Sequence, residues 1–118
     1  MLRVHGLKNC DTCRKALKWL RGEGIDHQFH DVRADDALDA AALDRWVAAV
    51  GWETLLNRRG TTWRKLDGPA TADVDEGRAK ALMLAHPALI KRPVFEAGGQ
   101  VVVGFKAAEQ ARIAEIVN

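Results

Sequence analysis

Two cysteines, Cys10 and Cys13, lie three positions apart where a predicted strand is followed by a predicted helix. They are the only cysteines among the 118 residues, within the segment Asn-Cys-Asp-Thr-Cys-Arg-Lys. Alternating apolar residues predict the strand over residues 2–5, and helical spacing predicts the helix over about residues 12–21. Two thiols at this spacing can close a disulfide with little backbone movement. The pair therefore indicates a redox dithiol or an activated nucleophile.

The two thiols are expected to differ. The free N–H groups and the macrodipole at a helix N-terminus favour a thiolate over a thiol. Cys10 is closer to that exposed end, so we expect it to have the lower pKa and to be the nucleophile. Cys13 falls inside the first helical turn and is expected to be more buried, as a resolving thiol would be. The alternative is that both are small buried hydrophobic residues without a chemical task.

Composition limits the classes of protein that this chain can belong to. The length and the 47% content of hydrophobic residues suffice for one domain with a core, without a disulfide framework or a structural metal. Two cysteines suit a reducing compartment and the first residues do not resemble a signal peptide, so a cytoplasmic location is expected. No apolar stretch approaches the length of a membrane span, so no membrane partner is expected. Eighteen basic and 16 acidic residues give a net charge of +2, too balanced to imply direct binding of nucleic acid.

The remaining pattern predicts an α/β chain with helices gathered in its middle. Alternation predicts a second strand over residues 26–32, and an amphipathic helix is expected over residues 36–50. Residues 57–65 are expected to form a basic loop, and Asp73 is expected to cap a helix that ends near Ala85.

A hairpin with its turn at Gly98 and Gly99 and a last helix over about residues 106–117 complete the order βαβ, helical block, ββα. Because no Pro- or Ser-rich linker marks a boundary, residues 1–118 are expected to form a single domain with an all-helical insertion over about residues 36–90. No long apolar stripe remains once the core is assigned, which predicts a monomer.

This order resembles the thioredoxin fold, in which the strand opposite the dithiol is entered through a cis-proline. Pro93 occupies that place. The helical insertion is typical of the arsenate reductase-like (ArsC/Spx) branch of the fold, and the chain is most similar to its YffB-like members. Three segments carry the resemblance: Asn-Cys-Asp-Thr-Cys-Arg-Lys at 9–15, Leu-Leu-Asn-Arg-Arg-Gly-Thr-Thr-Trp-Arg-Lys-Leu at 55–66, and His-Pro-Ala-Leu-Ile-Lys-Arg-Pro at 86–93.

The resemblance implies an anion-binding role for arginines near the thiols. Arg92 matches an arginine of the family's active site, where a guanidinium can hold an oxyanion or a substrate carboxylate and stabilise the Cys10 thiolate. A second family arginine corresponds to Arg59 or to Arg58, and we favour Arg59, although an ungapped match places Asn57 there.

The third arginine of arsenate reductases has no counterpart, since the equivalent region offers only Lys106. A lysine is a point charge and does not replace a bidentate fork, which argues against arsenate as the substrate.

No metal site is expected. His27 and His30 are three apart on a predicted strand, so their side chains point to opposite faces and do not join the cysteines around zinc. His5 and His86 are expected to be structural. No bound cofactor is expected either.

Three functions follow from the resemblance. The preferred one is a thiol-disulfide oxidoreductase that uses glutathione as co-substrate, with substrate backbone pairing beside Pro93. The first alternative is a redox-sensing transcriptional regulator of the Spx type, with Cys10 and Cys13 as the switch and the RNA polymerase alpha subunit as partner. The second alternative is a glutaredoxin-coupled arsenate reductase.

Overall fold

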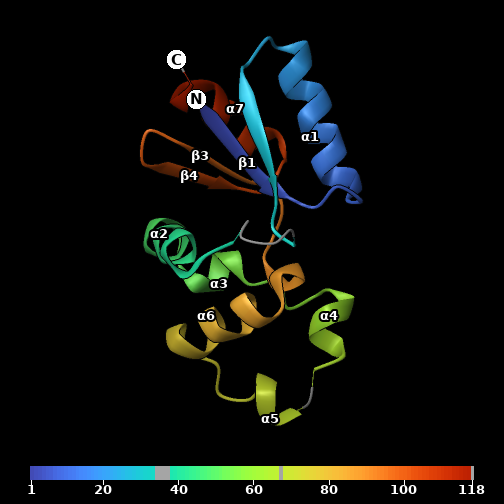
Figure 1. Cartoon of the computed structure of the whole chain (residues 1–118), viewed down its shortest axis with the longest axis vertical. Helices are drawn as coiled ribbons and strands as arrows, with labels where there is room; N and C mark the ends of the chain where they lie inside the picture. The colour runs from blue at the N-terminus through green and yellow to red at the C-terminus, as the bar shows by residue number, and fades with distance from the viewer. Residues whose placement is uncertain (34–37, 67, 118) are drawn as a thin grey trace. The chain divides into compact units, whose positions relative to one another are not determined.

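The strands of the described residues form one mixed sheet in the order β2-β1-β3-β4 (Figure 1). Strand β1 (Leu2–Gly6) pairs in parallel with β2 (His27–Asp31) and antiparallel with β3 (Val94–Ala97), and β3 continues antiparallel into β4 (Gln100–Val103). The computed structural model describes residues 1–33, 38–66 and 68–117. They fall into two compact units, one within Met1–Ala37 and Arg92–Asn118 and one within Leu38–Lys91.

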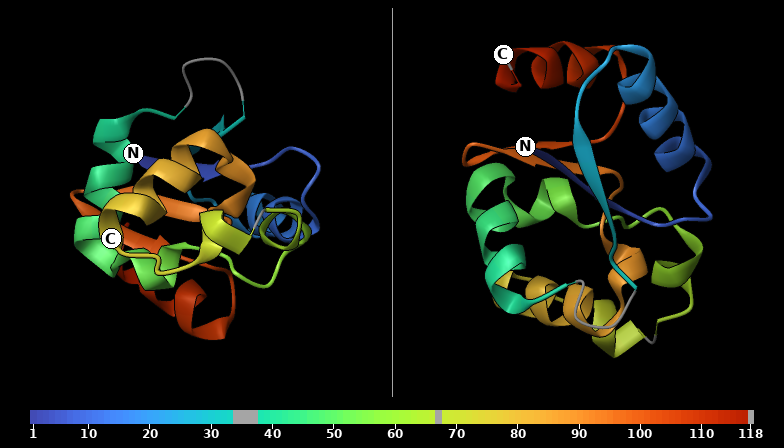
Figure 2. Two further views of the ribbon diagram at one scale, coloured as in Figure 1. Left: turned by 90° about the horizontal axis from the view of Figure 1, so that it is seen from below. Right: turned by 45° about the horizontal axis from the view of Figure 1, so that its top comes forward.

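In the first unit, helices α1 (Asp11–Gly22) and α7 (Ala107–Ile116) cover the same face of the sheet (Figure 2). The parallel strands β1 and β2 require a crossover between them, and α1 supplies it. The buried core combines residues from three strands with residues of both helices: Leu2, Val4, Ala16, Leu20, Phe95, Val102 and Ile113. The unit thus has the βαβ–ββα order of a thioredoxin-like fold, as predicted from the sequence.

The turn of the β3–β4 hairpin lies where the sequence predicts it. Gly98 and Gly99 have φ values of 55° and 80°, and a two-residue turn with both φ values positive matches the twist of the strands that it joins. Residues with side chains are strained in that region of conformational space, which explains the two consecutive glycines.

The second unit is helical. Its elements are α2 (Ala40–Val50), α3 (Trp52–Leu55), α4 (Thr61–Arg64), α5 (Gly68–Thr71), α6 (Glu76–Ala85) and the 3-10 helix η1 (Pro87–Leu89). Trp46 and Met83 are fully buried, and Leu56 and Ile90 form an isolated β-bridge. No helix in the described ranges has both the length and the apolar composition needed to cross a lipid bilayer.

The helical block differs from the sequence prediction at the beginning of two helices. The predicted start of the first helix, at residue 36, lies outside the described residues. Residues 38 and 39, which the sequence predicts to be helical, precede α2, and the N-cap Asp39 accepts a hydrogen bond from the Ala42 N–H at 2.7 Å. Helix α6 is capped by Asp75 rather than by Asp73, because the Asp75 carboxylate accepts from the Arg78 N–H while Asp73 has a φ of 49°.

The predicted basic loop at residues 57–65 is also wrong in part, because Thr61–Arg64 within it forms the single helical turn α4. Four residues are too few to show the periodicity by which a helix is predicted from a sequence.

His5 is a buried polar residue on the face of β1 opposite the core. Its Nε2 lies 3.0 Å from Oε1 of Glu96 in β3, and its ring stacks on His30 of β2 with centroids 5.2 Å apart. Burial lowers the pKa of His5 to about 4, because the loss of hydration outweighs the raising effect of the Glu96 carboxylate. His5 is therefore neutral at neutral pH, which agrees with a structural role.

The neutral state of His5 makes the fold acid-sensitive. As the pH falls from 6.5 to about 4, the unfolded chain binds a proton at His5 before the folded chain does, so the free energy of unfolding should drop by about 3 kcal/mol. Urea unfolding at both pH values would measure this drop, and His5→Gln should reduce it. The control His86→Gln, at an exposed site, should keep the full drop, and an equal drop in His5→Gln would contradict the assignment.

Candidate active site

The register of β1 and β3 brings together the two chain segments that form the candidate site. His5 pairs with Val94, so the residues that follow β1 and the residues that precede β3 lie at the same end of the sheet. Cys10 follows β1 as the N-cap of α1, and Arg92 precedes β3. Segments more than 80 positions apart in the chain thus meet at the start of α1.

Cys10 carries the more acidic of the two free thiols. Partial burial raises the pKa of Cys10. Hydrogen bonds from the Cys13 N–H, the Arg92 side chain and the Cys13 thiol lower it, as does the positive charge of Arg92, and together these lowering effects outweigh the effect of burial. The net pKa is below the ordinary value. The side chain is also partly exposed, so it is accessible to a substrate. These properties are those of a nucleophilic cysteine.

Cys13 has the opposite properties. It is 1% exposed, and burial raises the pKa of Cys13 to about 11, assisted by the neighbouring Cys10 and opposed by a hydrogen bond from the Leu7 N–H. At neutral pH the Cys13 thiol is therefore protonated and can donate to the Cys10 thiolate. The prediction of a more buried second thiol agrees with this geometry.

Gly6 and Leu7 contribute to the site although the sequence analysis did not single them out. A Cβ atom added to Gly6 would lie 2.5 Å from the Cys13 Sγ, so a larger residue there would displace the thiol. Leu7 contributes only its backbone N–H. A glycine at the end of a buried strand, directly before a turn, is a signal of close approach that could have identified Gly6.

Pro93 lies next to Arg92 and is buried. The Arg92–Pro93 peptide bond is cis, in agreement with the resemblance, and the Pro93 carbonyl accepts a hydrogen bond from the Gly104 N–H at 2.9 Å. A direct role of Pro93 in binding substrate stays a prediction.

The family model described as "ArsC family" matches residues 5–113. The chain belongs to the ArsC family.

Members of the family and related proteins align along most of the chain. A YffB protein of known structure superposes with a TM-score of 0.89 at 47% identity, covering 98% of this chain and 99% of its own. An ArsC-related protein from Brucella melitensis also has 47% identity, with a TM-score of 0.77 and coverage of 97% and 94%. An uncharacterised protein of Haemophilus influenzae is 42% identical over 92% of this chain and 95% of its own. The global transcriptional regulator Spx of Streptococcus mutans is 27% identical over 86% of this chain and 74% of its own.

The two other predicted arginines of this ArsC-family chain lie in the helical unit, before α4. The Arg58 guanidinium carbon is 5.8 Å from the centroid of the Trp52 ring, within the range of a cation–π contact. The Arg59 N–H donates to the Asn57 side chain at 3.0 Å, and the Arg59 carbonyl accepts from the Arg64 guanidinium at 2.9 Å. The backbone of Arg59 is thus held in place, and a role of either arginine beside Cys10 stays a prediction.

His27 and His30 lie in different environments. His27 Nδ1 lies 2.8 Å from the Ile25 carbonyl oxygen, whereas the His30 ring stacks on His5. Within the described part of the chain, no three His, Cys, Asp or Glu side chains are arranged to hold a metal ion.

A surface pocket of about 480 Å³ lies at the other end of β1 from the thiols. Leu2, Ile25 and Val117 contribute to its lining, together with Glu23 and Asp26. Since its lining includes neither cysteine nor Arg92, the pocket takes no part in the chemistry of the thiols.

The pKa of Cys10 is directly measurable. Because iodoacetamide reacts with the thiolate, labelling of Cys10 followed across pH by mass spectrometry should have a midpoint below that of a free cysteine. Arg92→Gln should raise this midpoint, since it removes both a hydrogen bond and a positive charge. Lys91→Gln removes a neighbouring exposed charge and should leave the midpoint nearly unchanged. An unchanged midpoint in Arg92→Gln would remove Arg92 from the site.

Proposed function

We propose that this ArsC-family protein is a thiol-disulfide oxidoreductase that uses glutathione as its co-substrate. The observation that carries the proposal is the opposite tuning of two adjacent thiols, a partly exposed Cys10 of lowered pKa beside a buried Cys13 of raised pKa. Cys10 would attack an external disulfide, and Cys13 would then attack the mixed disulfide formed on Cys10. The protein is expected to act as a monomer in the cytoplasm, without a bound cofactor.

In the first step the Cys10 thiolate attacks the glutathione sulfur of a mixed disulfide R–S–SG. A Cys10–glutathione disulfide forms, the S–S bond of R–S–SG breaks, and R–S⁻ leaves and takes a proton from water. Arg92, which donates to Cys10 in the free protein, is placed to hold a carboxylate of glutathione as the thiolate charge disappears. Arg59 or Arg58 would hold a second anionic group, and the backbone beside Pro93 would pair with the substrate.

In the second step Cys13 loses its proton to solvent and attacks the Cys10 sulfur. A Cys10–Cys13 disulfide forms and glutathione leaves as the thiolate. Modification of Cys10 removes both of its raising effects on the pKa of Cys13, while the Leu7 N–H and Arg92 continue to lower it. The pKa of Cys13 should therefore fall once Cys10 has reacted, while burial continues to raise it. Two molecules of reduced glutathione then restore the dithiol and leave as glutathione disulfide.

A glutathionylated cysteine peptide tests the proposal. Wild-type protein with reduced glutathione should release the free peptide faster than glutathione alone, as followed by chromatography, and mass spectrometry should detect a transient glutathione adduct. Cys10→Ser should reduce release to the uncatalysed rate. Cys13→Ser should retain the first step and accumulate the adduct on Cys10.

Serine at either position keeps a hydroxyl of similar size, so both variants should keep the fold, and circular dichroism would check it. Turnover in Cys10→Ser equal to that of the wild type, or a wild-type rate no higher than that of glutathione alone, would refute the proposal.

A second candidate is a redox-sensing regulator, favoured by the relationship to Spx of Streptococcus mutans. A regulator should bind the C-terminal domain of the RNA polymerase alpha subunit differently in its dithiol and disulfide forms. We expect no such redox-dependent binding when the two forms are passed over the immobilised domain. Binding confined to one form, together with little peptide release in the previous assay, would favour the regulator over the reductase.

A further inference from the structure

The turn that carries Cys10 is held at the backbone of one residue, Lys8, by two side chains. Residues 7–10 form a turn closed by a hydrogen bond from the Cys10 N–H to the Leu7 carbonyl at 3.3 Å. Within the turn, the Lys8 N–H donates to Oδ2 of Asp31 at 3.4 Å, and the Lys8 carbonyl accepts from Nε of Arg14 at 3.3 Å. Both polar backbone groups of Lys8 are therefore engaged by side chains from outside the turn.

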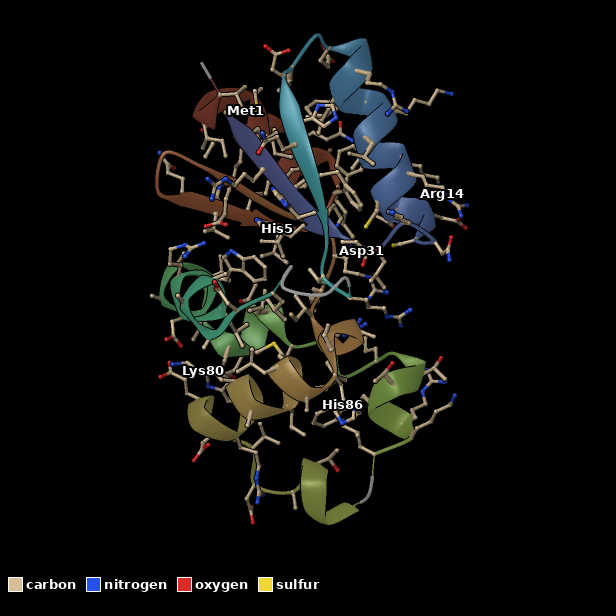
Figure 3. The ribbon with its side chains drawn as sticks, viewed as in Figure 1. Met1, His5, Arg14, Asp31, Lys80 and His86 are labelled. Atoms are coloured by element: carbon tan, nitrogen blue, oxygen red, sulfur yellow. The ribbon has the colours of Figure 1, made fainter. Side chains whose placement is uncertain are left out.

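These two side chains come from different elements and are themselves oriented. Asp31 is the last residue of β2, and its Oδ1 accepts from the Arg33 N–H at 2.8 Å (Figure 3). Arg14 lies in the first turns of α1, where its guanidinium also contacts Oδ1 of Asp11 at 3.4 Å. The turn is thus tied at one side to the sheet and at the other to the helix that bears the thiols.

We propose that Asp31 and Arg14 are positioning residues of the dithiol, which act by fixing the backbone of Lys8 on both sides of its Cα atom. Leu7 directly precedes Lys8, and the Leu7 N–H donates to the Cys13 sulfur. A displacement of Lys8 would therefore be transmitted to Leu7, while Cys10 would keep its hydrogen bonds from the Cys13 N–H within α1 and from Arg92. Asp31 and Arg14 thereby assist the attack by Cys13 more than the attack by Cys10. This role rests on the proposed function only in so far as Cys13 resolves a mixed disulfide on Cys10.

The two attacks can be separated with the aromatic disulfide DTNB, without glutathione or a physiological substrate. The Cys10 thiolate attacks DTNB, forms a Cys10–thionitrobenzoate disulfide and releases one coloured thionitrobenzoate anion. Cys13 then loses a proton, attacks the Cys10 sulfur and releases a second anion, so stopped-flow absorbance should show two phases. Asp31→Asn and Arg14→Gln should each slow the second phase by about two- to tenfold, the equivalent of one ordinary hydrogen bond, and change the first phase less.

The two substitutions have opposite effects on charge, which separates positioning from electrostatics. Asp31→Asn removes a negative charge and Arg14→Gln removes a positive one, so a simple charge effect on the Cys13 thiol would change the second phase in opposite directions. The positioning role predicts slowing in both. Lys18→Gln, which removes an exposed positive charge from the same helix without contacting the turn, should leave both phases near the wild-type rates.

Opposite changes in the two variants, or slowing of the first phase as large as that of the second, would overturn the proposal. Failure of the proposed function looks different in this assay. A protein that does not act on glutathionylated peptide but still shows the two phases, with the second slowed in both variants, retains the positioning role.

Discussion

The antiparallel pairing of β1 with β3 is the constraint on which the site depends. With His5 opposite Val94, the end of β1 lies next to the start of β3, and the Arg92 side chain reaches the Cys10 sulfur. A slip of one residue in this pairing would turn either Val4 or Phe95 out of the core, so burial of the core fixes the register. The position of Arg92 beside Cys10 is therefore enforced by apolar packing well away from the thiols.

The unequal pKa values of the two thiols are a consequence of their closeness. Two thiolates in hydrogen-bonding contact would repel each other strongly, so ionisation of one thiol opposes ionisation of the other. Ionisation is favoured at Cys10, where the thiolate accepts from the Cys13 N–H and Arg92, while Cys13 is buried against Gly6. The difference between the two thiols thus follows from the local surroundings of each sulfur.

The sequence predicts the parts of this structure that depend on local pattern. The strand and helix around Cys10, the hairpin turn at Gly98 and Gly99, and the place of Pro93 follow from alternation, helical spacing, glycine chemistry and family motifs. It does not distinguish Asp73 from Asp75 as a cap, because both residues have the same capping chemistry and only the backbone conformation separates them.

The contributions of Leu7, Asp31 and Arg14 escape prediction for a related reason. Leu7 acts through its backbone N–H, and Asp31 and Arg14 act on the backbone groups of Lys8, so no pairing of side-chain types in the sequence indicates these contacts. A contact to backbone depends on where the chain passes, which the sheet register and the helix direction decide together.

Burial of Cys13 has two opposed effects on the reactivity of its thiol. It hides the thiol from external disulfides, so that Cys13 has Cys10 as its accessible partner, and it also raises the pKa, which reduces the fraction of reactive thiolate. The Leu7 N–H lowers that pKa without opening the site to solvent. A backbone donor is suited to this task because it adds no net charge that would also stabilise a competing anion, and it keeps its place only as long as the turn around Lys8 does. The rigidity of one exposed turn is in this way coupled to the reactivity of a buried sulfur.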